Sequence, residues 1–188
     1  MSVFKNEDEV IRALKEAWRG YNPYAKINLA SYKMDEHFEK WFKTKLPLLT
    51  QPEIDIITCE EQGRKLRAHE VKYFRAVDKG INYGFYEGLD EALALLRFGF
   101  DDVALVHIFD EEISAEQMND YAKEMQKLLE ATNSPVHYDY YLLKSDKSFD
   151  KQYIYNFKAT RSNPFLYDEN SRKIISLIRG LLRIPSPP

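Results

Sequence analysis

Two acidic residues and a lysine are set in two short apolar runs of this chain. Asp55 lies within the apolar run 54–57, and Glu70 and Lys72 flank Val71 in a second run. A solvated loop is not expected at either place, because the neighbouring residues are apolar and favour strands. These side chains are therefore expected to lie on strands, and their spacing in the sequence then predicts which of them face each other.

The spacing predicts an antiparallel hairpin. A turn centred between Gln62 and Gly63, where glycine can take a positive φ, places Asp55 directly opposite Glu70. Because side chains alternate along a strand, Glu70 and Lys72 share one face, and Asp55 shares it with them.

Such a face suits metal chemistry. Two directly opposed carboxylates, with β-carbons roughly 5 Å apart, repel each other, and a divalent cation between them would offset that repulsion. A neighbouring lysine would suit negative charge developing on a phosphate or an attacking water. An ordinary solvated hairpin face carrying Asp, Glu and Lys would use the same residue types, so the pattern leaves that alternative open.

Other chemistries find less support in the sequence. The four histidines show neither an H-x-x-x-H nor an H-E-x-x-H spacing, and no P-loop, dinucleotide-binding or serine-hydrolase string occurs. His107 falls in a buried-looking run and is expected to be a satisfied core residue. His69 precedes Glu70 and is expected to point to the opposite face.

Composition indicates one globular domain in a reducing compartment. The chain has 188 residues, is 44% hydrophobic and 30% charged, and contains one cysteine. That length can bury a core without disulfides, and a lone Cys59 argues against a structural zinc site. The charged N-terminus and the lack of a long apolar run predict a cytoplasmic protein without a membrane partner. The net charge of −3 is unusual for a nucleic-acid binder, although basic residues gather locally.

Helical and strand patterns alternate along the chain. Helices are predicted at 7–19, 34–46, 89–98, 115–131 and 169–183, and strands at 53–59, 66–74, 103–109 and 136–143. Residues 20–33 look irregular. Helices between strands predict an α/β fold, with a mixed sheet that has helices on its faces.

This arrangement resembles the PD-(D/E)xK nuclease superfamily, which has the restriction-endonuclease-like fold. The resemblance covers about Met34 to Leu143 and is carried by Pro52 through Asp55, by Glu70-Val71-Lys72, and by the helix and buried strand of 86–109. It implies a mixed sheet core flanked by helices, with extra N- and C-terminal helices here.

The resemblance also implies a site. Asp55, Glu70 and the backbone carbonyl of Val71 would bind Mg²⁺ or Mn²⁺, and Lys72 would act on the attacking water or the phosphate. Glu53 competes with Asp55 for the metal, because it follows the proline directly; the register with Glu70 favours Asp55.

The helix before the hairpin would add a further carboxylate. Glu39 is the first choice, in a catalytic role, with Asp35 and Glu36 as competitors. Acidic residues at the start of the helix after Lys72, Asp90 and Glu91, are expected only to favour the helix dipole.

The sequence thus predicts one domain in three parts: an N-terminal helix and aromatic loop (1–33), a nuclease-like core (34–143) and a C-terminal extension (144–188). Its expected function is divalent-metal-dependent hydrolysis of DNA phosphodiester bonds, as an endonuclease. The alternatives are an inactive nuclease-fold module that binds nucleic acid or assembles with a partner, and a metal-free structural protein. The helix 169–183 is expected to complete the core, with a homodimer contact as its other use.

Overall fold

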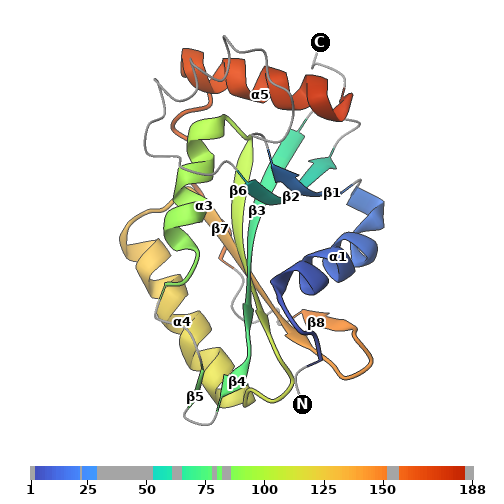
Figure 1. Ribbon diagram of the computed structural model, residues 1–188. Coiled ribbons are helices and arrows are strands. Elements are labelled where there is room, and N and C mark those ends of the chain that lie inside the picture. Colours follow the sequence, from blue (N-terminus) through green and yellow to red (C-terminus); the bar gives the residue numbers. More distant parts are fainter. Residues whose placement is uncertain are drawn as a thin grey trace.

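Apolar, β-branched and aromatic runs form one six-stranded mixed sheet at the centre of the molecule (Figure 1). The computed structural model describes residues 3–21, 23–28, 53–60, 65–77, 80–81, 86–151 and 157–184. The strand order is β1-β2-β3-β6-β7-β8. The strands are β1 (Tyr24–Asn28), β2 (Glu53–Glu60), β3 (Lys65–Phe74), β6 (Asp102–Phe109), β7 (Val136–Leu143) and β8 (Phe149–Lys151).

The sheet has an antiparallel side and a parallel centre. β1 pairs antiparallel with β2, and β2 pairs antiparallel with β3. β3, β6 and β7 run parallel, and β8 returns antiparallel along β7. β3 therefore lies between an antiparallel and a parallel neighbour, and β6 is almost wholly buried, as its continuous apolar run predicted.

Helices pack on both faces of the sheet. α1 (Glu7–Ala17) buries Val10, Ile11 and Leu14 against one face. α3 (Leu89–Leu95) and α4 (Ala115–Ala131) connect the parallel strands and pack on the opposite face (Figure 1). The α/β class and the helix-flanked mixed sheet are therefore as the sequence predicted.

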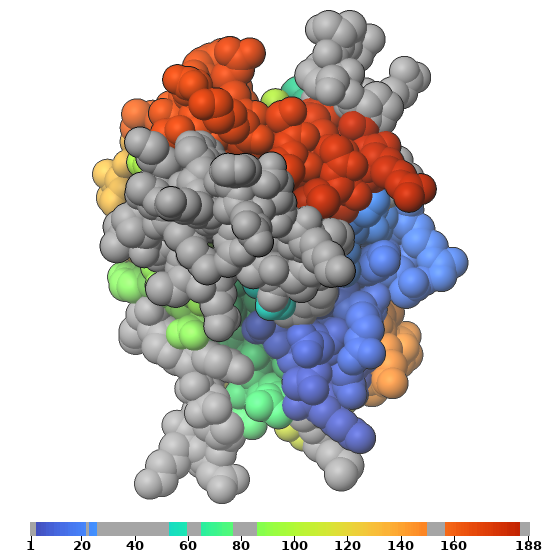
Figure 2. Space-filling model, turned by 45° about the horizontal axis from the view of Figure 1, so that its top comes forward, coloured from blue at the N-terminus to red at the C-terminus, as the bar shows by residue number. Residues whose placement is uncertain are grey.

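The last helix, α5 (Glu169–Leu182), completes the core, as preferred from the sequence. It buries Ile174 and Ile178 in the same cluster as α3 and α4. In the space-filling view, α5 forms a red band across the upper part of the molecule (Figure 2). Gly99, with φ +80°, permits the close approach, because a β-carbon there would lie 2.8 Å from the backbone oxygen of Ser171.

Side-chain caps fix where the helices begin. Asn6 accepts a hydrogen bond from the Glu9 N–H at the start of α1. Ser114 and Gln117 form the predicted capping box of α4. Asp168 caps α5 through Ser171.

Two segments differ from, or lie outside, the expectations. Residues 20–33 were expected to be irregular, and this is wrong in part, since they contain β1 and the end of a 3₁₀ turn, Arg19–Tyr21. β1 is a five-residue edge strand that is defined by pairing with β2 rather than by its own pattern. The predicted helix 34–46, with Asp35, Glu36 and Glu39, lies outside the described residues. A small ladder, β4 (Ala76–Val77) with β5 (Gly80–Ile81), follows β3.

In the part of the chain that the structure describes, no helix combines the length and apolar character needed to cross a membrane.

His107 is a satisfied core residue, as predicted. Its ring nitrogens lie 3.1 Å from the Tyr138 hydroxyl and 3.0 Å from the Glu87 carbonyl oxygen. Burial lowers its pKa to about 3, the Lys72 charge acts in the same direction, and the hydrogen bond to Glu87 opposes both. The folded protein therefore keeps His107 neutral at pH values where the unfolded chain would protonate it.

This burial predicts an acid-labile core. Between about pH 6.5 and pH 4 the unfolded state binds a proton that the folded state does not, so the free energy of unfolding falls as the pH falls, by up to about 1.4 kcal/mol per pH unit from this group. His107→Gln keeps a hydrogen-bonding side chain but does not titrate. Urea unfolding of both proteins from pH 7 to pH 4 should give a shallower pH dependence for the variant; parallel curves would contradict the assignment.

Candidate metal centre

The hairpin register is the one that the sequence predicted. β2 and β3 pair from Glu60 opposite Lys65 to Ile56 opposite His69. The pairing ends there, and the same register continued by one residue would place Asp55 opposite Glu70. The two carboxylates therefore come from neighbouring strands at the same level of the sheet.

Beyond His69, side-chain carboxylates accept hydrogen bonds from backbone N–H groups of β3. The Val71 N–H donates to Asp55 Oδ2 over 2.9 Å, and the Tyr73 N–H donates to Glu7 Oε2 over 3.3 Å. Since the N–H and C=O of one strand residue point to the same side, the Val71 carbonyl faces the side on which the Asp55 carboxylate lies. Asp55 thus ends the hairpin pairing and stays next to a backbone oxygen.

Both central carboxyl groups are buried. Asp55 is 6% exposed and Glu70 is 4% exposed. An isolated buried carboxylate is costly unless it is paired and hydrogen-bonded. For Glu70 that partner is Lys72, whose Nζ lies 2.8 Å from Glu70 Oε1.

Glu91 is a second partner of Lys72. The Lys72 Nζ lies 2.9 Å from Glu91 Oε2, so the ammonium lies between carboxylates of β3 and α3. The sequence predicted only a dipole role for Glu91, because its position in the first turn of a helix is explained by that role alone. The structure adds it to the side chains gathered around Lys72.

Gly88 makes room for this lysine. Gly88 precedes α3 with φ +76°, and a β-carbon there would lie 2.8 Å from both Cγ and Cε of Lys72. Any other residue would therefore be strained in its backbone and would press on the lysine stem. This glycine lets Lys72 extend beneath the start of α3 and reach Glu91.

Among the described side chains around Lys72, carboxyl groups outnumber the single ammonium group. Burial, a hydrogen bond with the Glu91 carboxyl and the charge of Asp55 raise the pKa of Glu70 to about 10, against the opposing effect of Lys72. Burial alone would lower the pKa of Lys72, but Glu70 and Glu91 raise it above its usual range. Lys72 therefore stays charged, and Glu70 keeps its proton to a higher pH than an ordinary carboxyl group does. A cation brought to Glu70 would replace that proton.

The donor set fits a hard divalent cation. Asp55, Glu70 and the Val71 carbonyl offer only oxygen atoms, and Mg²⁺ takes one or two protein carboxylates while keeping several waters. Among the residues described, no group of three or more His, Cys, Asp or Glu side chains forms a ready metal cage. The oxygen atoms of Asp55, Glu70 and Val71 would serve as the few protein ligands of such an ion.

Three further acidic residues are candidates for the metal site. Glu39 lies outside the described residues. Glu53, the competing ligand, is exposed at the start of β2. Glu7, which the sequence had placed only on a helix, contacts β3 at Tyr73 and helps to raise the pKa of Lys72. Nothing in the local sequence could indicate this contact, because α1 and β3 are far apart in the chain.

Comparison of the chain with protein-family models, with curated proteins and with solved structures finds no match.

The retained proton predicts an unusual alkaline sensitivity. Because the pKa of Glu70 is raised on folding, the folded state binds a proton that the unfolded state has lost above about pH 4.5, so stability falls as the pH rises toward about 10. Glu70→Gln should flatten this decline by up to about 1.4 kcal/mol per pH unit, measured by urea unfolding in EDTA from pH 6 to pH 9. Glu111→Gln, on an exposed turn, is the matched control. Equal slopes for wild type and Glu70→Gln would show that Glu70 carries no such proton.

Proposed function

We propose that this protein is a divalent-metal-dependent nuclease that hydrolyses DNA phosphodiester bonds, with a restriction-endonuclease-like core of the PD-(D/E)xK type. One observation carries the proposal: buried Asp55 and Glu70 lie on neighbouring strands, one residue beyond the last pair of the β2–β3 register, and the Lys72 ammonium is paired with Glu70. The mixed sheet and the helix between β3 and β6 support it.

The residues divide the work of hydrolysis. A bound Mg²⁺ or Mn²⁺ would neutralise phosphate charge and help to generate the nucleophile near neutral pH. Asp55, Glu70 and the Val71 carbonyl would hold the ion. Lys72, kept protonated by its acidic neighbours, would orient the attacking water or stabilise charge on the phosphate. Glu91 would keep the ammonium in place once Glu70 turns to the metal.

Besides Asp35 and Glu36, the helix carboxylate of the proposal has two candidates. Glu39 is the one that the resemblance favours. Glu7 is the one that the structure brings to β3, where it accepts a hydrogen bond from Tyr73. Either would supply a further acidic group for a water or a second ion.

DNA as the substrate, a cytoplasmic location and a homodimeric state remain parts of the proposal. The net charge of −3 includes the carboxylates of the site, which a metal would offset. Basic residues on α5, among them Arg172 and Lys173, are exposed and would face a polyanion without being part of the metal site.

A second candidate is a module of this fold that binds nucleic acid or assembles with a partner without turnover. It is favoured by the contacts of Lys72, whose ammonium is held by two carboxylates. The acidic net charge favours it too. In that case the site would bind no divalent cation, so calorimetric titration with Mn²⁺ separates the two candidates.

Cleavage assays test the proposal directly. Supercoiled plasmid and single-stranded oligonucleotides are incubated with Mg²⁺ or Mn²⁺ and with wild type, Asp55→Asn or Lys72→Met. Each substitution should lower the cleavage rate by roughly 10²-fold or more, since each removes a group that acts on the reacting phosphate. Glu53→Gln, two residues from Asp55 and exposed, should cleave like wild type.

The variants must keep the wild-type circular dichroism spectrum for the comparison to count. Unchanged cleavage by folded Asp55→Asn or Lys72→Met would reject the site. Loss of activity in Glu53→Gln alone would move the metal ligand to Glu53. Absence of both cleavage and Mn²⁺ binding in wild type would favour the second candidate.

A further inference from the structure

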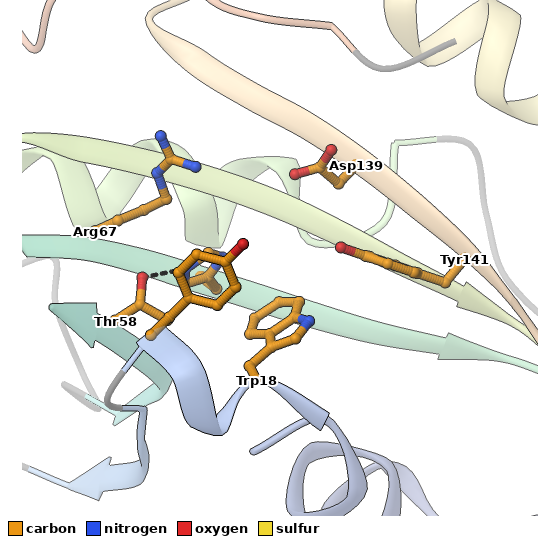
Figure 3. Close-up of a pocket in the computed structure, with 7 residues that line it drawn as sticks. Trp18, Thr58, Arg67, Asp139 and Tyr141 are labelled. Atoms are coloured by element: carbon orange, nitrogen blue, oxygen red, sulfur yellow. Dashed lines mark hydrogen bonds between the residues drawn. The ribbon is translucent and has the colours of Figure 1, made fainter. Parts of the chain in front are cut away.

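A pocket of about 170 Å³ opens on the face of the sheet that carries α1. Trp18 and Tyr21, at and after the end of α1, form its outer wall, and side chains of β2, β3 and β7 form its floor. In Figure 3, Trp18 points toward the strands, while the hydroxyl of Tyr141 and the carboxylate of Asp139 point toward the middle of the pocket. This pocket has no part in the site described above.

The pocket and the carboxylate pair lie on opposite faces of the same strand. Arg67 and His69 alternate along β3 with Glu70 and Lys72, so the first two face α1 and the last two face α3. On the neighbouring strand, Ala104 pairs with both His69 and His137. This small side chain leaves room between the larger groups of β3 and β7.

Two buried polar atoms beside the pocket have no partner among the described residues. They are Nε of Arg67 and Nδ1 of His69. His69 is 5% exposed, and its other nitrogen lies 2.9 Å from Thr58 Oγ1. Buried polar groups in proteins nearly always have a hydrogen-bonding partner. Both residues line the pocket, and these two atoms are themselves covered by neighbouring protein atoms.

The charges around the pocket are mixed. Asp102 anchors the Arg67 guanidinium, with Nη2 and Oδ2 3.1 Å apart, and within the described parts of the chain Nε has no hydrogen-bond partner. Burial lowers the pKa of His69 to about 3, with smaller effects of Arg67 and His137 in the same direction, so its ring is neutral. Asp139 adds an acceptor on the opposite side. A simple anion would be repelled by Asp139, whereas a ligand with both donors and acceptors on its edge would match.

The walls are aromatic. The Trp18 ring lies 4.9 Å from the His69 ring and 6.1 Å from the Tyr141 ring, between centroids. Tyr21 is 57% exposed at the rim. Exposed or half-buried aromatic side chains around a polar floor suit a flat heterocycle, which stacks on the rings and presents its edge to the polar groups.

We propose that this pocket binds a single nucleobase, preferably guanine, with its ring against Trp18 and its edge between Arg67 and Asp139. Guanine offers the acceptors O6 and N7 that arginine recognises, and an amino group and a ring N–H that a carboxylate can accept from. The base comes either from a free nucleotide or from an unpaired position of a nucleic-acid strand. The inference does not depend on the proposed nuclease activity, because the two sites share no side chain.

Fluorescence of Trp18 reports occupancy directly. The chain has two tryptophans, so Trp41→Phe leaves Trp18 as the only reporter. Titration with GMP should quench its emission in a saturable way, and AMP, CMP and UMP should bind roughly tenfold or more weakly, because each carries the same phosphate but a different base edge. In the same background, Asp139→Asn should weaken GMP binding about tenfold or more, whereas Asp146→Asn, on an exposed turn, should not change it.

Two further titrations identify the source of the base and test whether the pocket acts independently of the proposed metal site. A single-stranded oligonucleotide with one dG in a dA background, if it binds more tightly than GMP, assigns the pocket to a nucleic-acid strand; the reverse order assigns it to a free nucleotide. Glu70→Gln should bind GMP like the parent protein even if the metal site fails. Equal affinity for all four nucleotides, displacement by inorganic phosphate alone, or no quenching up to about 5 mM GMP would overturn the proposal.

Discussion

The ion pairs of Lys72 with two carboxylates form the interaction on which the candidate metal centre depends. Lys72 lies between buried Glu70 and partly exposed Glu91, and the charge of buried Asp55 acts on Glu70. Burial and the acidic neighbours of Glu70 raise its pKa to about 10, against the opposing effect of Lys72. Burying such a group of charges costs free energy of folding.

Backbone features of β2, β3 and Gly88 position these side chains. The Val71 N–H donates its hydrogen bond to the Asp55 carboxylate and not to the backbone of β2. The β2–β3 pairing ends just before this point, at Ile56 and His69. Gly88 then leaves the space that the lysine stem occupies. β3 also has two chemical faces: Glu70 and Lys72 face α3, while Arg67 and His69 line the pocket beside α1. One strand therefore positions both the proposed metal centre and the proposed base pocket.

The sequence predicted the elements whose signals are local. The hairpin register followed from one turn position and the alternation of strand side chains, and the α4 cap followed from Ser114 and Gln117. β1 was missed, because a short edge strand is defined by its partner. The roles of Glu7 and Glu91 were missed for a related reason, since each depends on a contact between distant elements. The pocket beside α1 could not be predicted either, because it combines residues that follow α1 with residues of β2, β3 and β7, and no spacing connects them. Glu39 stays a prediction.

Proton release on metal binding tests the central claim most directly. Calorimetric titration of the protein with Mn²⁺ at pH 7.5, in buffers that differ in ionisation enthalpy, counts the protons displaced per ion bound. We expect wild type to release about one proton per ion bound, and Glu70→Gln to bind Mn²⁺ more weakly without that release. Binding heats that do not depend on the buffer, or Mn²⁺ binding that is unchanged in Glu70→Gln, would contradict it.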